Sequence, residues 1–175
     1  KGRDPNILTS IYIDPVDEEV TNLRLLKRWK TIEKNEVRYT EQYMDDAEYA
    51  VIGFGTAGRV ASSAVKIARQ EGIKVGLLRP ITLAPFPKER ILEITKQVKR
   101  ILVVEMNTGM MLNDVTAITA GKVPVEFYGR LGGVTPLPDE ILDEIYRINK
   151  MKGQADGEPR RRWMEHLDKL ISGGQ

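Results

Sequence analysis

The sequence is 175 residues long, with 41% hydrophobic and 30% charged residues, a composition typical of a folded globular chain. Its 27 Lys and Arg nearly balance its 25 Asp and Glu, and the formal net charge of +2 argues against a dedicated nucleic-acid surface. The absence of cysteine excludes disulfides, thiolate zinc sites, iron–sulfur ligation and a cysteine nucleophile within this chain, and no apolar stretch is long enough to span a membrane.

Residues 1–46 are predicted to be a linker and an amphipathic helix that lead into the main domain. Ile7 to Ile13 favours an extended segment, and Asp14 with Pro15 is typical of a helix start. The apolar positions of this helix suit packing across another surface; they are Val20, Leu23, Leu25, Leu26, Trp29 and Ile32. Residues 36–48 are acidic and irregular, which predicts a joint without regular structure.

Residues 47–150 are predicted to form one domain in which strands and helices alternate four times. Strands are expected at residues 50–52, 73–78, 101–105 and 123–128. Helices are expected over residues 60–68, from Pro87 to Val98, up to Ala120, and around Ile141 to Ile148. Because the strands are apolar throughout rather than alternating, they indicate a parallel sheet covered on both faces. The fold class is therefore α/β, a three-layer α/β/α sandwich with a mostly parallel sheet.

Residues 151–175 are predicted to be a polar linker followed by a short C-terminal helix that packs back or reaches a partner. The helix carries Trp163 directly after a basic run, Arg160 to Arg162. Trp163 fits a subunit interface better than base stacking, since the overall charge is balanced and no nucleic-acid motif accompanies it. His166 is expected to be a surface residue without a catalytic role, because no triad spacing surrounds it.

Gly53-Phe-Gly-Thr-Ala-Gly58 has the G-x-G-x-x-G spacing between a strand and a helix, and is one candidate cofactor-binding segment. Gly53, Gly55, Thr56 and Gly58 are its candidate residues. In a dinucleotide site, the glycines permit a tight turn and let a phosphate approach the helix N-terminus. The next strand ends in Arg79, which suits a 2′-phosphate, so a self-contained NADP-binding oxidoreductase domain is one alternative. The other explanation, which we favour, is that the glycines make a tight strand-to-helix turn.

Further candidates follow the later strands: Glu105 and Asn107 after the third, and Arg130 after the fourth. Since ligands of open α/β sheets bind outside the carboxyl ends of the strands, these residues are expected to converge with Thr56 and Arg79 on one crevice. A structural role is the favoured alternative, with Asn107 capping a helix and Glu105 paired to a basic residue. No catalytic residue and no metal ligand is predicted.

Several segments together resemble one family in order. They are Tyr49-Ala-Val-Ile-Gly-Phe-Gly-Thr-Ala-Gly-Arg59, Glu71-Gly-Ile-Lys-Val-Gly-Leu-Leu-Arg-Pro-Ile-Thr-Leu83 with Pro85-Phe-Pro87, Val103-Val-Glu-Met-Asn107 with Gly109, and Pro124-Val-Glu-Phe-Tyr-Gly-Arg-Leu-Gly-Gly133. Over residues 20–149 the sequence resembles the carboxyl-terminal part of the alpha subunit of 2-oxoacid:ferredoxin oxidoreductases, of the 2-oxoisovalerate or 2-oxoglutarate type. One departure is Met110, where such sequences commonly have Gln.

The resemblance implies a transketolase carboxyl-terminal-like domain in an enzyme that oxidatively decarboxylates a 2-oxoacid to its acyl-CoA. A cytoplasmic location is expected from the absence of cysteine and of a membrane-spanning stretch. Such enzymes use thiamine diphosphate with magnesium, coenzyme A, and iron–sulfur clusters that pass electrons to ferredoxin. This chain has no Gly-Asp-Gly segment for magnesium diphosphate and begins at Lys1, so we expect a fragment that binds none of these cofactors alone.

Beta, gamma and delta type subunits, and ferredoxin through the complex, are the expected partners; nucleic acid and membrane are not. The crevice would then be a subunit contact surface or part of a route for coenzyme A. A non-enzymatic interaction module that uses the terminal helices remains the third alternative.

Overall fold

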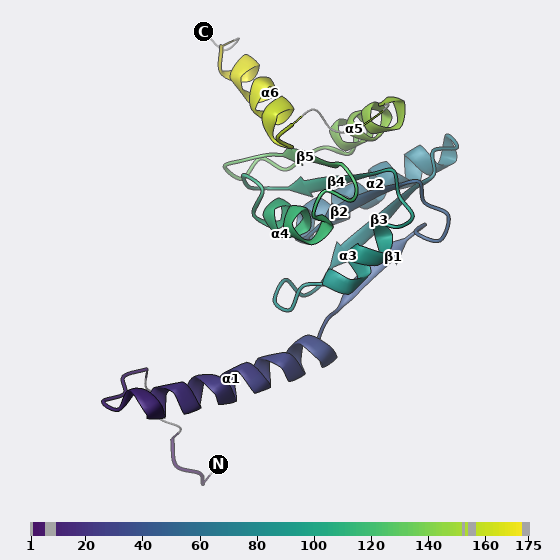
Figure 1. The fold of residues 1–175 in the computed structure, drawn as a ribbon. Helices are drawn as coiled ribbons and strands as arrows, with labels where there is room; N and C mark the ends of the chain where they lie inside the picture. The colour runs from purple at the N-terminus through teal and green to yellow at the C-terminus, as the bar shows by residue number, and fades with distance from the viewer. Residues whose placement is uncertain (1, 6–9, 152, 154–156, 173–175) are drawn as a thin grey trace.

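The computed structural model describes residues 2–5, 10–151, 153 and 157–172 (Figure 1). Its helices are α1 (Pro15–Asn35), α2 (Gly55–Gln70), α3 (Lys88–Ile94), α4 (Met110–Thr119), α5 (Pro138–Lys150) and α6 (Arg161–Ser172). Its strands are β1 (Tyr39–Gln42), β2 (Tyr49–Gly53), β3 (Val75–Pro80), β4 (Arg100–Glu105) and β5 (Val125–Gly129). The extended segment expected from Ile7 lies partly outside the described residues, and residues 10–13 are not a strand.

The five strands form one sheet in the order β1-β3-β2-β4-β5. Strands β3, β2, β4 and β5 are parallel, and β1 pairs antiparallel with β3 at one edge. From β2 the chain moves first to β3 on one side and then across to β4 on the other. The strand order therefore reverses between β2 and β4, which makes this the topological switch point of the sheet.

Helices cover both faces of the sheet, as the sequence predicted. On one face, α2 and α5 pack on strand residues such as Val51, Leu77 and Leu102. On the other face, α3 and α4 pack on the alternate residues, among them Ile52 and Val103. Because strand side chains alternate between the two faces, every residue of β2, β4 and β5 is buried. The three-layer α/β/α sandwich is confirmed.

Strand β1 is the main element that the sequence analysis missed, since the prediction of an irregular joint was wrong at residues 39–42. The Glu41 carboxylate accepts two hydrogen bonds from Arg90 of α3, at 2.7 and 3.1 Å. Gln42 accepts one from Ser62 Oγ of α2, at 2.8 Å. This edge strand is therefore held by polar side-chain contacts to both helical layers as well as by its pairing with β3.

Several element ends also differ from the predictions. Helix α3 ends at Ile94, so Val98, expected on its apolar face, lies in the loop that follows and is buried there. The fourth predicted strand begins two residues late, at Val125, directly after Pro124. A proline just before a strand removes no ladder hydrogen bond, in agreement with the expected position of Pro124 at the strand start.

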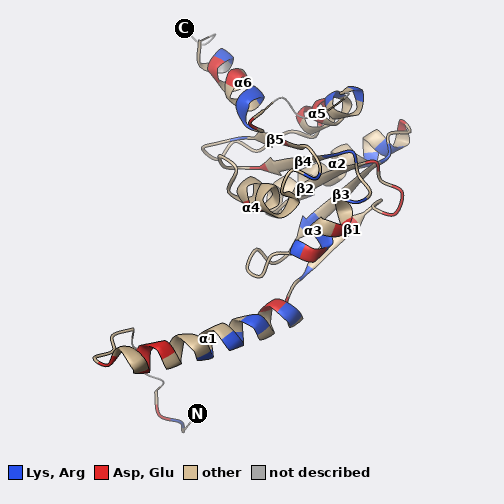
Figure 2. Ribbon diagram, viewed as in Figure 1, with Lys and Arg blue, Asp and Glu red and all other residues tan. Residues whose placement is uncertain are grey.

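Helix α1 projects away from the sheet and has no buried residue (Figure 1). Asp14 is its N-cap, and its side chain accepts a hydrogen bond from the Val16 N–H at 2.9 Å. Figure 2 shows acidic residues at its N-terminal end and mostly basic residues further along, with an acidic position again in the last turn. This order suits the helix dipole. Among the described residues, no helix is long and apolar enough to cross a membrane.

Helix α6 docks on β5 through Trp163, which is 6% exposed. The indole Nε1–H donates a 2.7 Å hydrogen bond to the Gly129 carbonyl, and the ring meets Phe127 edge-on with centroids 5.1 Å apart. The expectation that Trp163 lies in a subunit interface was therefore wrong, because the side chain belongs to the core of this chain. Leu167 packs beside the same cluster.

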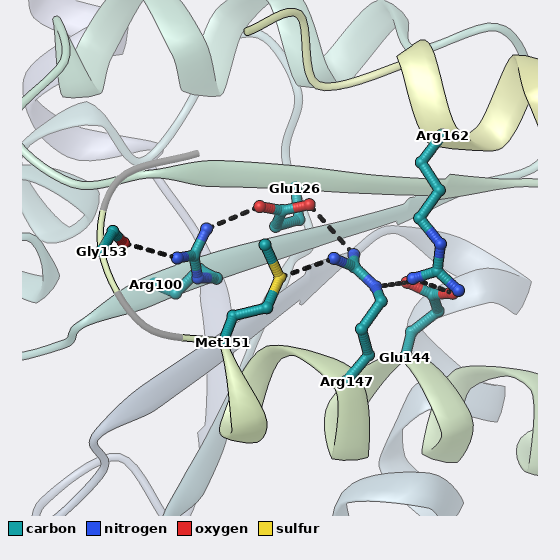
Figure 3. Close-up of polar contacts among 7 residues, drawn as sticks. All are labelled: Arg100, Glu126, Glu144, Arg147, Met151, Gly153 and Arg162. Atoms are coloured by element: carbon teal, nitrogen blue, oxygen red, sulfur yellow. Dashed lines mark hydrogen bonds and ion pairs between the residues drawn. The ribbon is translucent and has the colours of Figure 1, made fainter. Parts of the chain in front are cut away.

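A chain of ion pairs also joins β4, β5, α5 and α6 (Figure 3). Its members are Arg100, Glu126, Arg147, Glu144 and Arg162, with Met151 and the Gly153 carbonyl as further acceptors. Arg100 is 2% exposed and donates to Glu126 at 2.6 Å. Since a buried charge without a partner is costly, Glu126 is the carboxylate on which the network depends. Burial raises the pKa of Glu144 despite its pairing with Arg147.

Candidate functional site

A crevice of about 490 Å³ opens at the topological switch point, where the loops after β2 and β4 part toward opposite faces of the sheet. Ligand sites of open α/β sheets recur at this position. The crevice lies between the N-terminal turns of α2 and α4. Its lining residues are Phe54, Gly55, Thr56, Ala57, Leu83, Val104, Glu105, Met106, Asn107, Met110, Met111 and Asp114.

Four of the eight residues predicted from the sequence line this crevice: Gly55, Thr56, Glu105 and Asn107. The expected convergence is therefore partial. Gly53 and Gly58 lie in the turn at its base, whereas Arg79 and Arg130 are not among its lining residues.

The carboxylate of Glu105 serves as the cap of α4. Its two oxygens accept hydrogen bonds from the N–H groups of Met111 and Leu112, each at 2.9 Å, and one also accepts from Asn107 Nδ2 at 3.1 Å. Asn107 Oδ1 in turn accepts from the N–H groups of Gly109 and Met110, at 2.7 and 2.9 Å. Both side chains thus satisfy the free N–H groups at a helix start, which is a structural role.

The glycine motif makes a close contact between strand and helix. An ideal Cβ built on Gly58 would lie 2.2 Å from the Gly53 carbonyl oxygen, and one on Gly53 would lie 2.9 Å from the Gly58 Cα. Gly55 instead has a positive φ of +57°, with nothing near its missing side chain. Two of the glycines are thus required by packing and one by the turn conformation, which supports the interpretation as a tight turn.

Neither predicted arginine reaches into the crevice. Arg79 lies on β3, and its Cγ would be 3.0 Å from a Cβ on Gly58, so the stem of its side chain packs along the start of α2. Arg130 forms an ion pair with Glu140 of α5. Burial alone would raise the pKa of Glu140, but the Leu137 N–H, Tyr128 and Arg130 together hold it below its ordinary value. Burial and Glu140 raise the pKa of Tyr128.

Sequence reasoning missed the apolar character of the crevice. Phe54, Leu83 and Met110 lie on its rim with 42, 47 and 71% of their surface exposed. The available signal was Phe54 itself, a large side chain directly after a buried strand and inside the glycine motif. Leu83 comes from the proline-rich loop after β3, and nothing in its local sequence indicates where that loop returns.

The sequence is similar to that of known oxidoreductase subunits. Residues 47–141 match the family described as pyruvate:ferredoxin oxidoreductase core domain II. The ketoisovalerate oxidoreductase subunit VorB of Methanothermobacter thermautotrophicus is 43% identical over 150 residues, which cover 86% of this chain and 42% of that protein. The 2-oxoglutarate synthase subunit KorA of Methanothermobacter marburgensis is 40% identical over 103 residues, 59% of this chain and 28% of that protein.

Solved structures show the same fold at lower identity. A 2-oxoglutarate:ferredoxin oxidoreductase from Magnetococcus marinus matches with a TM-score of 0.65 and 18% identity, over 78% of this chain and 24% of that one. A split-gene transketolase matches with a TM-score of 0.53 and 16% identity, over 63% and 40%. The chain spans about two fifths of the length of the VorB relatives that it matches. The chain therefore belongs to the 2-oxoacid:ferredoxin oxidoreductase subunits and carries their core domain II.

Proposed function

We propose that this chain is part of the alpha subunit of a thiamine-diphosphate-dependent 2-oxoacid:ferredoxin oxidoreductase of the cytoplasm. The enzyme would convert a 2-oxoacid and coenzyme A to acyl-CoA and carbon dioxide, and pass the electrons to ferredoxin. Within it, the domain packs other subunits through the crevice at the switch point. The family match and the relatives described above support the reaction class, and the geometry of the crevice supports the packing role.

The residues of the chain do not fit the metal-containing cofactors of this reaction. The sequence contains no cysteine to ligate an iron–sulfur cluster. Within the described part of the chain, no group of three His, Asp or Glu residues is placed to hold a metal ion. At the crevice, Glu105 already accepts three hydrogen bonds, which leaves it a poor ligand for magnesium diphosphate. We therefore assign thiamine, magnesium and the clusters to other parts of the enzyme.

One observation carries the packing role: the Glu105 and Asn107 side chains are committed to hydrogen bonds within the chain, whereas three large apolar side chains around the crevice are exposed. Oxygens of Glu105 and Asn107 accept hydrogen bonds from the backbone N–H groups at the start of α4. The exposed apolar side chains are Phe54 from the β2–α2 loop, Leu83 from the loop after β3 and Met110 from the first turn of α4. Exposed Thr56 and Asp114 lie among them. A cluster of exposed apolar side chains is typical of a contact surface. Beta, gamma or delta type subunits are the partners that we propose for this surface.

The test places a charge on the rim in the complete complex. Met110→Asp combined with Leu83→Asp should weaken co-purification with the partner subunits at least about tenfold, since each apolar side chain contributes roughly 1.5–3 kcal/mol when buried. Reduction of a viologen dye that depends on 2-oxoacid and coenzyme A should fall in parallel. Ile171→Asp on α6, also at an exposed apolar residue, is the matched control. Unchanged assembly and activity of the rim variant would contradict the packing role.

For the substrate, we favour a branched-chain 2-oxoacid. The ketoisovalerate oxidoreductase subunit matches over 150 residues, whereas the 2-oxoglutarate synthase subunit matches over 103 at similar identity. The assay is kcat/KM of the complex for 2-oxoisovalerate against 2-oxoglutarate. A higher value for 2-oxoglutarate would refute the preference without affecting the packing role.

A further inference from the structure

The basic run before Trp163 folds back onto the loop that bounds the crevice. Arg160 donates from Nε to the Thr108 carbonyl at 2.6 Å, and from Nη2 to the Gly109 carbonyl at 2.8 Å. The same nitrogen reaches Asn113 Oδ1 at 2.6 Å. One guanidinium therefore holds two successive carbonyls of the β4–α4 loop and the first turns of α4.

The loop is shaped to receive this side chain. Gly109 has a φ of +99°, and a Cβ on it would lie 2.8 Å from Arg160 Nη2, so the guanidinium occupies the space that any other residue's side chain would fill. The group also lies over the Phe127 ring, 5.9 Å from its centroid. A planar fork of donors makes such contacts, whereas a lysine offers a single ammonium.

Two opposite supports thus fix the loop. From the side of the sheet, Glu105 and Asn107 bind its N–H groups. From the side of the C-terminal segment, Arg160 binds its carbonyls. Because Asn107 and Met110 line the crevice, the position of the loop sets the shape of the rim.

The attachment of α6 does not depend on Arg160 alone. Trp163 is buried against β5, and Arg162 pairs with Glu144 at 3.2 Å. Within the described part of the chain, the only ion pair of the neighbouring Arg161 is an exposed one with Glu165, at 3.9 Å. Removal of the Arg160 side chain is therefore separable from detachment of the helix, and Arg161 offers a matched control.

We propose that Arg160 is a positioning residue for the crevice: it holds the loop from Asn107 to Met110 so that the apolar rim has the shape its partner recognises. This rests on the proposed packing function. It gives the C-terminal segment a role in recognition, through a contact from the far end of the chain to the switch point.

The test compares Arg160→Ala, Arg160→Lys and Arg161→Ala in the complete polypeptide, alone and with its partner subunits. Amide hydrogen exchange is followed over residues 109–113 and, as an internal reference, over β2. We expect exchange about tenfold faster at residues 109–113 in Arg160→Ala, corresponding to about 1.4 kcal/mol. Exchange in β2 and in Arg161→Ala should not change. Arg160→Lys should resemble the alanine variant, since the ammonium cannot reproduce the fork.

The affinity for partner subunits is measured on the same samples, and should fall about tenfold for both Arg160 variants. Unchanged exchange at residues 109–113 in Arg160→Ala would overturn the positioning role. Wild-type exchange in Arg160→Lys would overturn the requirement for a guanidinium fork. Faster exchange with unchanged affinity would leave the hold on the loop standing and overturn its role in recognition. A rim variant of Met110 and Leu83 that still binds normally would overturn the packing function itself.

Discussion

Gly58→Ala is the sharpest test of whether the glycine motif is a structural turn. The added methyl would lie 2.2 Å from the Gly53 carbonyl oxygen and 2.8 Å from its carbonyl carbon. Carbon and oxygen normally touch at roughly 3.2 Å or more, so β2 and α2 would have to separate by about 1 Å. Backbone cannot rotate away as a side chain can, and the contact lies between two elements buried in the core.

Overpacking of this kind costs about 3 kcal/mol, at the upper end of the usual range, because the clash is with backbone. For a chain of this length, that corresponds to a fall in Tm of roughly 10 °C, measured by circular dichroism or calorimetry. The matched control is Gly72→Ala, where φ is +85° and no atom lies within 4 Å. Only left-handed backbone strain acts there, about 1 kcal/mol. Equal Tm values for the two variants would refute the packing explanation. Micromolar NADPH binding, lost in Gly55→Leu, would restore the dinucleotide alternative.

Three further outcomes follow from the polar contacts. Glu126→Gln leaves the buried Arg100 without a counter-charge and should lower the free energy of unfolding in urea by about 3 kcal/mol. The control Glu165→Gln, at an exposed pair, should change it almost not at all. Similar losses in the two variants would contradict the importance of the network. Trp163→Phe removes the donor to the Gly129 carbonyl, so α6 should become more sensitive to limited proteolysis, with a loss of about 1–2 kcal/mol. Because the pKa of Glu140 is lowered in the fold, its ionised carboxylate stabilises the protein above pH 4.5, and this stabilisation is lost as the pH falls and the group is protonated. Glu140→Gln should therefore reduce the pH dependence of the unfolding free energy on the acid side. An unchanged pH dependence would show that the carboxylate contributes nothing.

The four parallel strands could be predicted because they are continuously apolar, and the helices between them because their apolar residues recur on one face. Strand β1 could not, since Glu41 and Gln42 face helices through polar contacts and leave no alternation to detect. Trp163 shows a different limit. The amphipathic pattern of the C-terminal helix predicts that Trp163 packs against another surface. Only the fold shows that this surface is the Gly129 end of β5 in the same chain.

The candidate site was predictable in position but not in character. The strand order places the ends of β2 and β4 together, so Thr56 and Glu105 were correctly expected to share a crevice. Which groups remain free depends on contacts between distant segments. Arg130 is taken by Glu140 from α5, and the carbonyls beside Asn107 are taken by Arg160, 51 or 52 residues further along the chain.

Strand β1 also protects the molecule from unwanted association. Its partner β3 is nearly all apolar, and without β1 it would end the sheet as a bare row of backbone donors and acceptors, a template for strands of other molecules. β1 pairs with that row. It is only four residues long and mostly polar, so its own outer edge is a poor template for strands of other molecules. A shortened chain that begins at residue 47 would keep every buried strand of the sheet and still lose this cover. Residues 39–42 therefore matter for solubility as well as for shape.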